Sequence, residues 1–254
     1  MRRVRAVARI AHAVAHGLHG LALVLVSFPS LDAAARQERI RWWSRKMLAV
    51  LGIAFEHHGT PAQGGSLLAA NHISWLDIMA IHAVVPQARF VSKADVKAWP
   101  LVALLVDSAG TLYLERERKR DALRVVHAVA EALSAAQVVA IFPEGTTSTG
   151  HALLPFHANL LQAAIATATP VQPVAVRFSE AANAVSEAVE FVGATSLLRS
   201  LWQTSCGEGV RVRLTFLPPR RSEHADRRAL AALLRADIAG ALGIDPDAAP
   251  ATSA

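Results

Sequence analysis

The stretch Ser66-Leu-Leu-Ala-Ala-Asn-His-Ile-Ser-Trp-Leu-Asp77 joins a short apolar run to the start of a helical pattern. The run 66–70 predicts a buried strand, and the residues after it predict a helix over 75–84. Ligand-binding side chains of open α/β sheets gather where strands end, and His72 stands at such a point, five residues before Asp77. If Asp77 lies in the first helical turn, its carboxylate accepts the Nδ1 proton of His72 and leaves Nε2 free to take another proton. The pair is therefore a candidate general base with its orienting carboxylate.

The same residues also have purely structural explanations. Histidine and aspartate meet at this spacing by chance in many proteins, and an aspartate near a helix start interacts favourably with the helix dipole. Ser74 is interpreted as the N-cap of the helix. The segment by itself leaves the catalytic and the structural readings open.

A second segment, Ile141-Phe-Pro-Glu-Gly-Thr-Thr-Ser148, again follows an apolar run, 138–142, which predicts a strand buried on both faces. A glutamate at position 144 is costly there unless it binds something. Gly145 lets the backbone turn and approach a ligand closely. The hydroxyls of Thr146, Thr147 and Ser148 favour a site for an anion or a polyol.

Strand-like and helix-like runs alternate over the rest of the chain. This alternation predicts an α/β fold with a mainly parallel or mixed sheet covered by helices. The expected strands are 66–70, 89–92, 111–114, 138–142, 171–177 and 210–216, and the expected helices are 75–84, 119–136, 157–167 and 222–242.

The composition narrows the class of protein. Of the 254 residues 53% are apolar, and the net charge is +6. The mean hydropathy is +0.32 and the isoelectric point near 10.4. These values exclude intrinsic disorder, and a chain both apolar and basic suits an anionic membrane surface better than nucleic acid. The single cysteine, Cys206, excludes a disulfide-stapled fold and a cysteine-rich zinc module, which fits the reducing cytosolic side of a membrane.

The N-terminal region predicts membrane association. Residues 10–31 carry no Asp, Glu, Lys or Arg, a stretch long enough to span a bilayer. Basic residues flank it on both sides, so the positive-inside rule gives no orientation. A second alternative is a pair of amphipathic helices over 8–28 and 32–52, embedded in one leaflet. Trp42 and Trp43 would then lie at the headgroup level, and this arrangement fits as well as a span. A buried helical hairpin is the third alternative. We expect residues 1–53 to be this membrane-associated segment, 54–242 to be the α/β domain and 243–254 to be a disordered tail.

Taken together, the two segments resemble the glycerolipid acyltransferases of the 1-acylglycerol-3-phosphate (lysophosphatidate) O-acyltransferase type. The resemblance covers roughly residues 50–220, and all four family motifs occur in the family's order and spacing. The matching residues are Asn71, His72 and Asp77 for the first motif, Gly110–Arg116 for the second, Phe142–Thr146 for the third and Pro170–Ala175 for the fourth, with Phe90–Lys93 and Trp99-Pro100 similar to the segment between the first two.

This resemblance implies a reaction and a cellular place. His72, oriented by Asp77, deprotonates the free hydroxyl of a lysolipid, which attacks an acyl thioester. The acyl donor is acyl-CoA or acyl carrier protein, the product is phosphatidic acid for membrane phospholipid biosynthesis, and no bound cofactor or metal is required. The partners are membrane lipids and not nucleic acid, and the site of action is the cytoplasmic face of a bacterial inner membrane. The substrate-binding residues that the resemblance implies are Glu144, Gly145, Thr146 and Thr147, with Lys93 and Arg116 as cationic contacts to an anionic head group.

One residue departs from the family pattern. The third motif usually continues with arginine, where this chain has Thr147, so a cation is missing from the expected phosphate site. An acceptor without that phosphate, such as lyso-ornithine lipid, is therefore the alternative.

Three other classes remain as rivals. His72, Asp77 and Glu144 are possible metal ligands by residue type. A serine hydrolase is disfavoured because the sequence contains no Gly-x-Ser-x-Gly. A non-catalytic lipid-binding protein fits the composition, but would have no use for the base and its orienting carboxylate.

Overall fold

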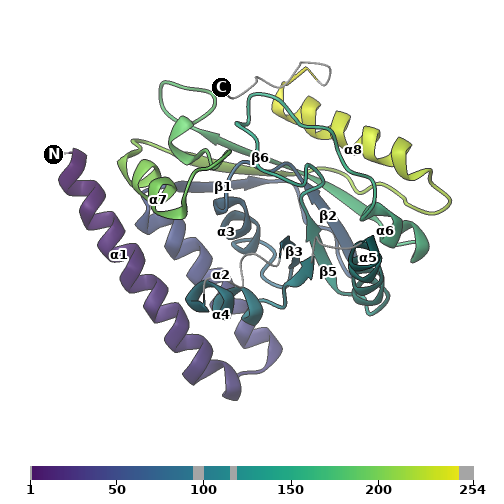
Figure 1. Ribbon diagram of the computed structural model, residues 1–254, viewed down its shortest axis with the longest axis horizontal. Coiled ribbons are helices and arrows are strands. Elements are labelled where there is room, and N and C mark those ends of the chain that lie inside the picture. Colours follow the sequence, from purple (N-terminus) through teal and green to yellow (C-terminus); the bar gives the residue numbers. More distant parts are fainter. Residues whose placement is uncertain (1, 94–99, 115–118, 246–254) are drawn as a thin grey trace.

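The computed structural model describes residues 2–93, 100–114 and 119–245 of the chain. Over these residues the chain forms a seven-stranded sheet with the order β1-β7-β6-β2-β5-β3-β4 (Figure 1). The pair β6 and β7 is antiparallel and the other neighbouring pairs are parallel, so the predicted α/β class is confirmed in its mixed form. The strands are β1 (Ala54–His58), β2 (Ser66–Ala70), β3 (Arg89–Lys93), β4 (Leu112–Leu114), β5 (Val138–Ile141), β6 (Val171–Ser179) and β7 (Arg211–Phe216).

Helices cover both faces of this sheet. Side chains of α2 and α3 pack on one face, and side chains of α5, α6 and α8 pack on the other (Figure 1). Alternation along β2 directs Leu68 and Ala70 to the first face and Leu67 and Ala69 to the second, which is why every residue of this strand is buried. The helices are α1 (Arg2–Ala22), α2 (Ala33–Val50), α3 (Leu76–His82), α4 (Pro100–Ser108), α5 (Lys119–Ser134), α6 (Leu161–Ala166), α7 (Leu197–Cys206) and α8 (Arg227–Leu242).

Two predicted helices start later than the sequence indicates. Residues 157–160 precede α6 as a loop, where the His157 amide donates to the Pro143 carbonyl at 2.7 Å. The last helix starts after Asp226, whose carboxylate accepts hydrogen bonds from the amides of Arg228 (2.9 Å) and Ala229 (2.8 Å). The strand β1 and the helices α4 and α7 are additional elements that the sequence did not predict.

The N-terminal region forms an apolar helical stretch followed by α2. The stretch Arg2–Ser30 is long and apolar enough to cross a membrane, and only 17% of its most apolar window is buried. The helix α2 begins after Asp32, whose carboxylate accepts a hydrogen bond from the Ala35 amide at 2.8 Å. Rings of His16 and Trp43 stack at 5.3 Å between α1 and α2, and each ring donates a hydrogen bond to the other residue's backbone carbonyl at 3.0 Å.

Arginines at the start of α1 bind the end of α7. Arg9 donates to the carbonyls of Ser205 at 3.0 Å and Gly207 at 2.8 Å, and Arg2 donates to the carbonyl of Cys206 at 2.8 Å. These carbonyls are the unpaired acceptors at the negative end of the helix dipole. The first turns of α1 are thus fastened to the α/β domain (Figure 1).

Candidate active site

The site lies where β2 ends and α3 begins. The Nδ1 atom of His72 lies 2.8 Å from Oδ2 of Asp77, which is in the first turn of α3. The Asp77 side chain is fully buried, whereas that of His72 keeps 19% of its surface exposed. With Nδ1 donating to the carboxylate, the neutral ring presents an unprotonated Nε2, the form that a general base needs.

Asp77 also organises the turn between the strand and the helix. Its Oδ2 atom accepts hydrogen bonds from the amides of Ile73 (2.7 Å) and Ser74 (3.0 Å). The prediction that Ser74 caps the helix is wrong, because the N-cap residue is Trp75 and the Ser74 hydroxyl has no partner among the described residues. The carboxylate of Asp77 satisfies these amides instead, so one side chain fixes both the turn and the imidazole.

Two neighbours of His72 hold the end of β2 in place. The Asn71 amide group donates to the Val176 carbonyl at 2.9 Å and accepts from the Val176 amide at 2.7 Å, which joins β2 to β6. The ring of Phe142, which follows β5, stacks on the His72 imidazole with 3.9 Å between centroids and 9° between planes. The imidazole therefore has a fixed plane as well as a fixed hydrogen-bond partner.

Glu144 binds the backbone of the segment that carries His72. Its Oε1 accepts from the His72 amide at 2.7 Å and its Oε2 accepts from the Leu154 amide at 2.9 Å. The residue is only 3% exposed. Burial raises the pKa of the Glu144 carboxyl to about 7, against the opposing effect of the two amide hydrogen bonds. The glutamate that the sequence assigns to the substrate head group is thus placed to position His72.

This burial predicts a pH dependence of stability. The native carboxyl holds its proton more tightly than the unfolded one, so the fold loses stability as pH rises from about 4.5 to about 7 and Glu144 ionises. The variant Glu144→Gln has no such group. The difference in free energy of unfolding between the variant and the wild type should therefore shift by about 3 kcal/mol in favour of the variant across this window. Denaturant unfolding of both proteins at the two ends of the window measures the difference. Parallel pH profiles would contradict the burial of an ionising carboxyl.

The loop after Glu144 packs around the same backbone. Gly145 has a left-handed conformation with φ of +69°, and an added Cβ would lie 3.1 Å from Cδ2 of His157. Gly145 and Thr146 are exposed, while the Thr147 hydroxyl donates to the Phe191 carbonyl. Ser148 donates to the His72 carbonyl from its amide at 2.8 Å and from its hydroxyl at 3.2 Å. This loop and Glu144 hold both peptide groups that flank His72.

The two predicted cationic contacts are only partly covered by the structure. Lys93 is the last residue of β3, beside β4, but its side chain lies outside the described atoms. Arg116 lies outside the described residues. Within the ranges 2–93, 100–114 and 119–245, no group of three or more His, Cys, Asp or Glu side chains is arranged to hold a metal ion.

An apolar cavity of about 470 Å³ lies next to the site, a feature that the sequence analysis did not locate. It extends between α1, α2, α3 and α4, and Trp75 and Phe90 are part of its wall. The Phe90 ring stacks on Phe142 at 5.7 Å, and Phe142 in turn stacks on His72, so aromatic rings connect the cavity to the imidazole. The volume is in the usual range for small-molecule sites.

An imidazole held by a buried carboxylate at the end of a strand, beside an apolar cavity, has the geometry of a general base next to a site for an apolar ligand. The sequence matches the family described as Acyltransferase over residues 53–177. It is 35% identical over 240 residues to the lyso-ornithine lipid O-acyltransferase of Pseudomonas aeruginosa, with 91% of each chain covered. The chain therefore belongs to the acyltransferase family, as the four motifs predict.

Two further comparisons agree with this assignment. The chain is 35% identical over 209 residues to the 1-acyl-sn-glycerol-3-phosphate acyltransferase of Neisseria meningitidis, which covers 81% of each chain. The crystal structure of the 1-acyl-sn-glycerophosphate acyltransferase of Thermotoga maritima aligns with a TM-score of 0.74 at 20% identity, over 96% of this chain and 97% of that one. The second likeness supports the fold.

Proposed function

We propose that the chain transfers a fatty acyl group from acyl-CoA or acyl carrier protein to the free hydroxyl of 1-acylglycerol-3-phosphate, giving phosphatidic acid. The observation that carries this proposal is the geometry of His72, whose Nδ1 is held by a fully buried Asp77 while part of the ring stays exposed. A thioester is already activated, so positioning and proton removal suffice without a covalent acyl-enzyme.

The reaction uses this chain's residues in the following way. His72 Nε2 takes the proton of the lysolipid hydroxyl, and the oxygen forms a bond to the carbonyl carbon of the thioester. The carbon–sulfur bond then breaks, and the leaving thiolate takes the proton from His72. The neutral imidazole is regenerated and Asp77 stays ionised throughout, stabilising the transient imidazolium.

The acceptor head group is assigned to the loop after Glu144 and to the neighbouring cations. Gly145 and Thr146 are the exposed part of this loop, whereas the Thr147 hydroxyl already donates to Phe191. Lys93 at the end of β3 and Arg116 are the proposed contacts to the phosphate. Glu144 acts on the head group through the backbone that it holds.

One observation favours a second acceptor. Thr147 stands where the family pattern has arginine, and a relative that aligns over 91% of both chains is named a lyso-ornithine lipid O-acyltransferase. Lyso-ornithine lipid lacks the phosphate that an arginine would bind. It is therefore the alternative acceptor for the same His72 chemistry.

The choice is tested by offering both lysolipids in parallel to purified, detergent-solubilised protein, with labelled acyl-CoA and labelled acyl carrier protein as donors. We expect labelled phosphatidic acid from lysophosphatidate. Product from lyso-ornithine lipid alone would establish the alternative and make Thr147 the mark of a non-phosphate acceptor. No product from either acceptor, with folded protein, would contradict the proposed function.

The apolar cavity is the proposed site of the donor's acyl chain. Gly17 of α1 lines it, and an added Cβ there would meet no heavy atom within 4 Å. We expect Gly17→Leu to fill part of the space and to lower kcat/KM for long acyl donors relative to short ones on the order of tenfold. The matched control is Gly240→Leu in α8, where an added Cβ also meets nothing within 4 Å and the residue does not line this cavity. An unchanged chain-length profile in Gly17→Leu would place the acyl chain elsewhere.

We also propose that α1 and α2, residues 1–53, embed the enzyme in the cytoplasmic face of the bacterial inner membrane, and that residues 54–242 form the acyltransferase domain. Apolar side chains are exposed on α1 and on α4 and α7, both of which contact α1. They are Val4, Val7, Val14, Leu18, Leu101, Leu104, Leu198 and Trp202. The tail 243–254 falls largely outside the described residues and stays a prediction.

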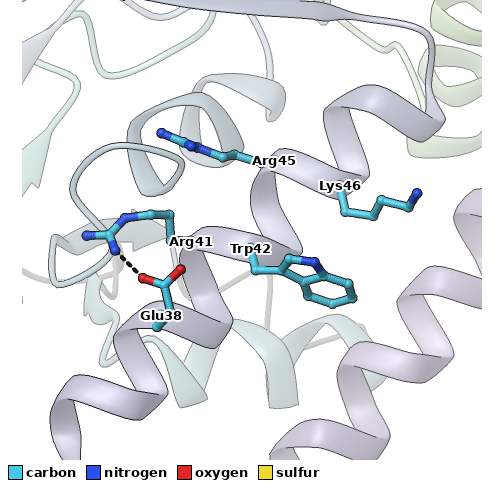
Figure 2. Close-up of a pocket in the computed structure, with 5 residues that line it drawn as sticks. All are labelled: Glu38, Arg41, Trp42, Arg45 and Lys46. Carbon is cyan, nitrogen blue, oxygen red and sulfur yellow. Dashed lines mark hydrogen bonds and ion pairs between the residues drawn. The ribbon is translucent and has the colours of Figure 1, made fainter.

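The exposed side of α2 carries residues that are typical of the headgroup layer of a membrane. Figure 2 shows Arg41 and Arg45 extending to one side of the helix and Trp42 and Lys46 to the other, around a shallow hollow of about 330 Å³ that Glu38 also lines. Glu38 pairs with Arg41 (Figure 2), so the cations outnumber the acids. Tryptophan beside arginine and lysine is typical of the headgroup layer of anionic membranes.

Membrane binding is testable with a pair of charge substitutions. Val14 and Leu18 of α1 are 53% and 56% exposed. Replacing both by glutamate should lower partitioning onto vesicles of anionic phospholipid by roughly 10- to 100-fold, because apolar area is lost and like charge is added. The control is Leu233→Glu on α8, where Leu233 is 43% exposed on the other side of the sheet (Figure 1). Equal partitioning of all three proteins would contradict the embedding of α1.

A further inference from the structure

An arginine of the last helix is connected to the catalytic segment. Arg235 of α8 donates from Nη2 to the Leu153 carbonyl at 2.8 Å and from Nε to the Leu154 carbonyl at 3.1 Å. The amide of the same Leu154 donates to Oε2 of Glu144, whose Oε1 accepts from the His72 amide. Four hydrogen bonds thus run from α8 to the backbone of His72, between residues that lie far apart in the sequence.

The segment that Arg235 binds has no regular structure of its own. Residues 151–157 lie between β5 and α6 without helix or strand, so the carbonyls of Leu153 and Leu154 have no place in a regular ladder and bind a side chain instead. Leu153 is buried and packs with Ile238 and Ala239 of α8, which places its carbonyl beside the guanidinium. A planar guanidinium can donate to two successive carbonyls at once, a geometry that a lysine ammonium on a flexible stem matches less well.

We propose that Arg235 is a positioning residue for acyl transfer, holding residues 153–154 so that the Leu154 amide keeps Glu144 fixed against the backbone of His72. This rests on the proposed roles of His72 and Glu144. The loss of Arg235 would free residues 153–154, Glu144 would lose one of its two amide donors, and the imidazole would lose its defined place relative to the substrate. Small misplacements of a catalytic group have large effects on rate.

The first test compares Arg235→Met with a control that removes another arginine contact to the same helix. Methionine keeps an apolar stem but removes both donors, and we expect kcat to fall on the order of 10- to 100-fold with little change in KM for the acyl donor. Arg235→Lys should recover part of this loss. The control is Arg220→Met, which removes a pair of hydrogen bonds from Arg220 to Asp237 of α8, at 2.6 and 2.8 Å, that does not lead to Glu144. Equal kcat in the two methionine variants would overturn the proposal.

A double-mutant cycle distinguishes positioning from a general loss of structure. If Arg235 acts through Glu144, Arg235→Met should cost little further activity in the Glu144→Gln background, whereas independent effects would multiply. If the two substitutions lower activity by fully multiplicative factors, the role of Arg235 is overturned and the proposed function is unaffected. Full activity of Glu144→Gln alone overturns the role of Glu144 and with it this proposal.

Hydrogen–deuterium exchange provides a readout that does not need turnover. Segments that contain the amides of His72 and Leu154 should exchange faster in Arg235→Met than in the wild type, and Arg220→Met should leave them unchanged. Unchanged exchange in Arg235→Met would overturn the proposal even for a preparation without activity.

Discussion

Replacing His72 by alanine is expected to lower kcat/KM for acyl transfer on the order of 10²- to 10⁴-fold, because the hydroxyl then loses its general base. The protein should still fold, since the backbone groups of His72, and not its ring, bind Glu144 and Ser148. Vesicle binding should also persist, since α1 and α2 are unchanged. Steady-state rates with labelled donor measure the effect.

The matched control is His127→Ala, which removes an exposed imidazole from α5 on the far face of the sheet. It should retain wild-type activity. If His72→Ala keeps comparable activity, His72 is not the base of the reaction. Loss of activity in both variants would indicate damage to the fold.

The second large effect is expected for Asp77→Asn, on the order of 10²- to 10⁴-fold in kcat. The neutral asparagine side chain cannot both accept hydrogen bonds at a single oxygen atom from His72 and from the backbone amides of Ile73 and Ser74 and stabilise the charge of the imidazolium. The wrong histidine tautomer then becomes accessible, with the proton on Nε2. The pH dependence of kcat, measured beside the wild type, reports this change.

Asp226→Asn is the control for Asp77→Asn, because Asp226 also accepts two amide hydrogen bonds at the start of a helix. Asparagine is a good N-cap, so this variant should change stability by at most about 1 kcal/mol and leave kcat unchanged. Equal loss of kcat in both variants would mean that Asp77 only builds its helix.

The local part of the site could be predicted from the sequence because it depends on spacing. Asp77 is five positions after His72, and a strand that turns into a helix brings them together without help from the rest of the chain. The central strands were also predictable, since β5 is apolar throughout, β2 is apolar after Ser66, and both are buried on both faces.

The rest of the site depends on contacts between distant segments. Glu144 was expected at a ligand, but it binds the amide of His72, and only the pairing of β2 with β5 reveals this. The edge strand β1 carries polar His57 and His58, which hide its pattern. The cavity is lined by side chains from several helices that lie far apart in the sequence, so no single run of residues indicates it.

The membrane-like character of the N-terminal region could be predicted from the sequence, but the contacts of its arginines could not. Arg2 and Arg9 are among the basic residues before residue 10, which were expected to flank a membrane segment, whereas both donate to carbonyls at the end of α7. Charge and hydropathy identify a helix that suits a membrane, but they do not show which of its cations the protein itself binds.

The most direct test of the central claim is a single-turnover experiment with a labelled acyl thioester, first without and then with lysophosphatidate, read by intact mass of the protein and by lipid analysis. With His72 as a base, the protein should gain no acyl mass at any time, and the label should leave the thioester for the lysolipid only when the acceptor is added. An acyl adduct on the protein before the acceptor arrives, or release of labelled fatty acid without it, would contradict direct transfer.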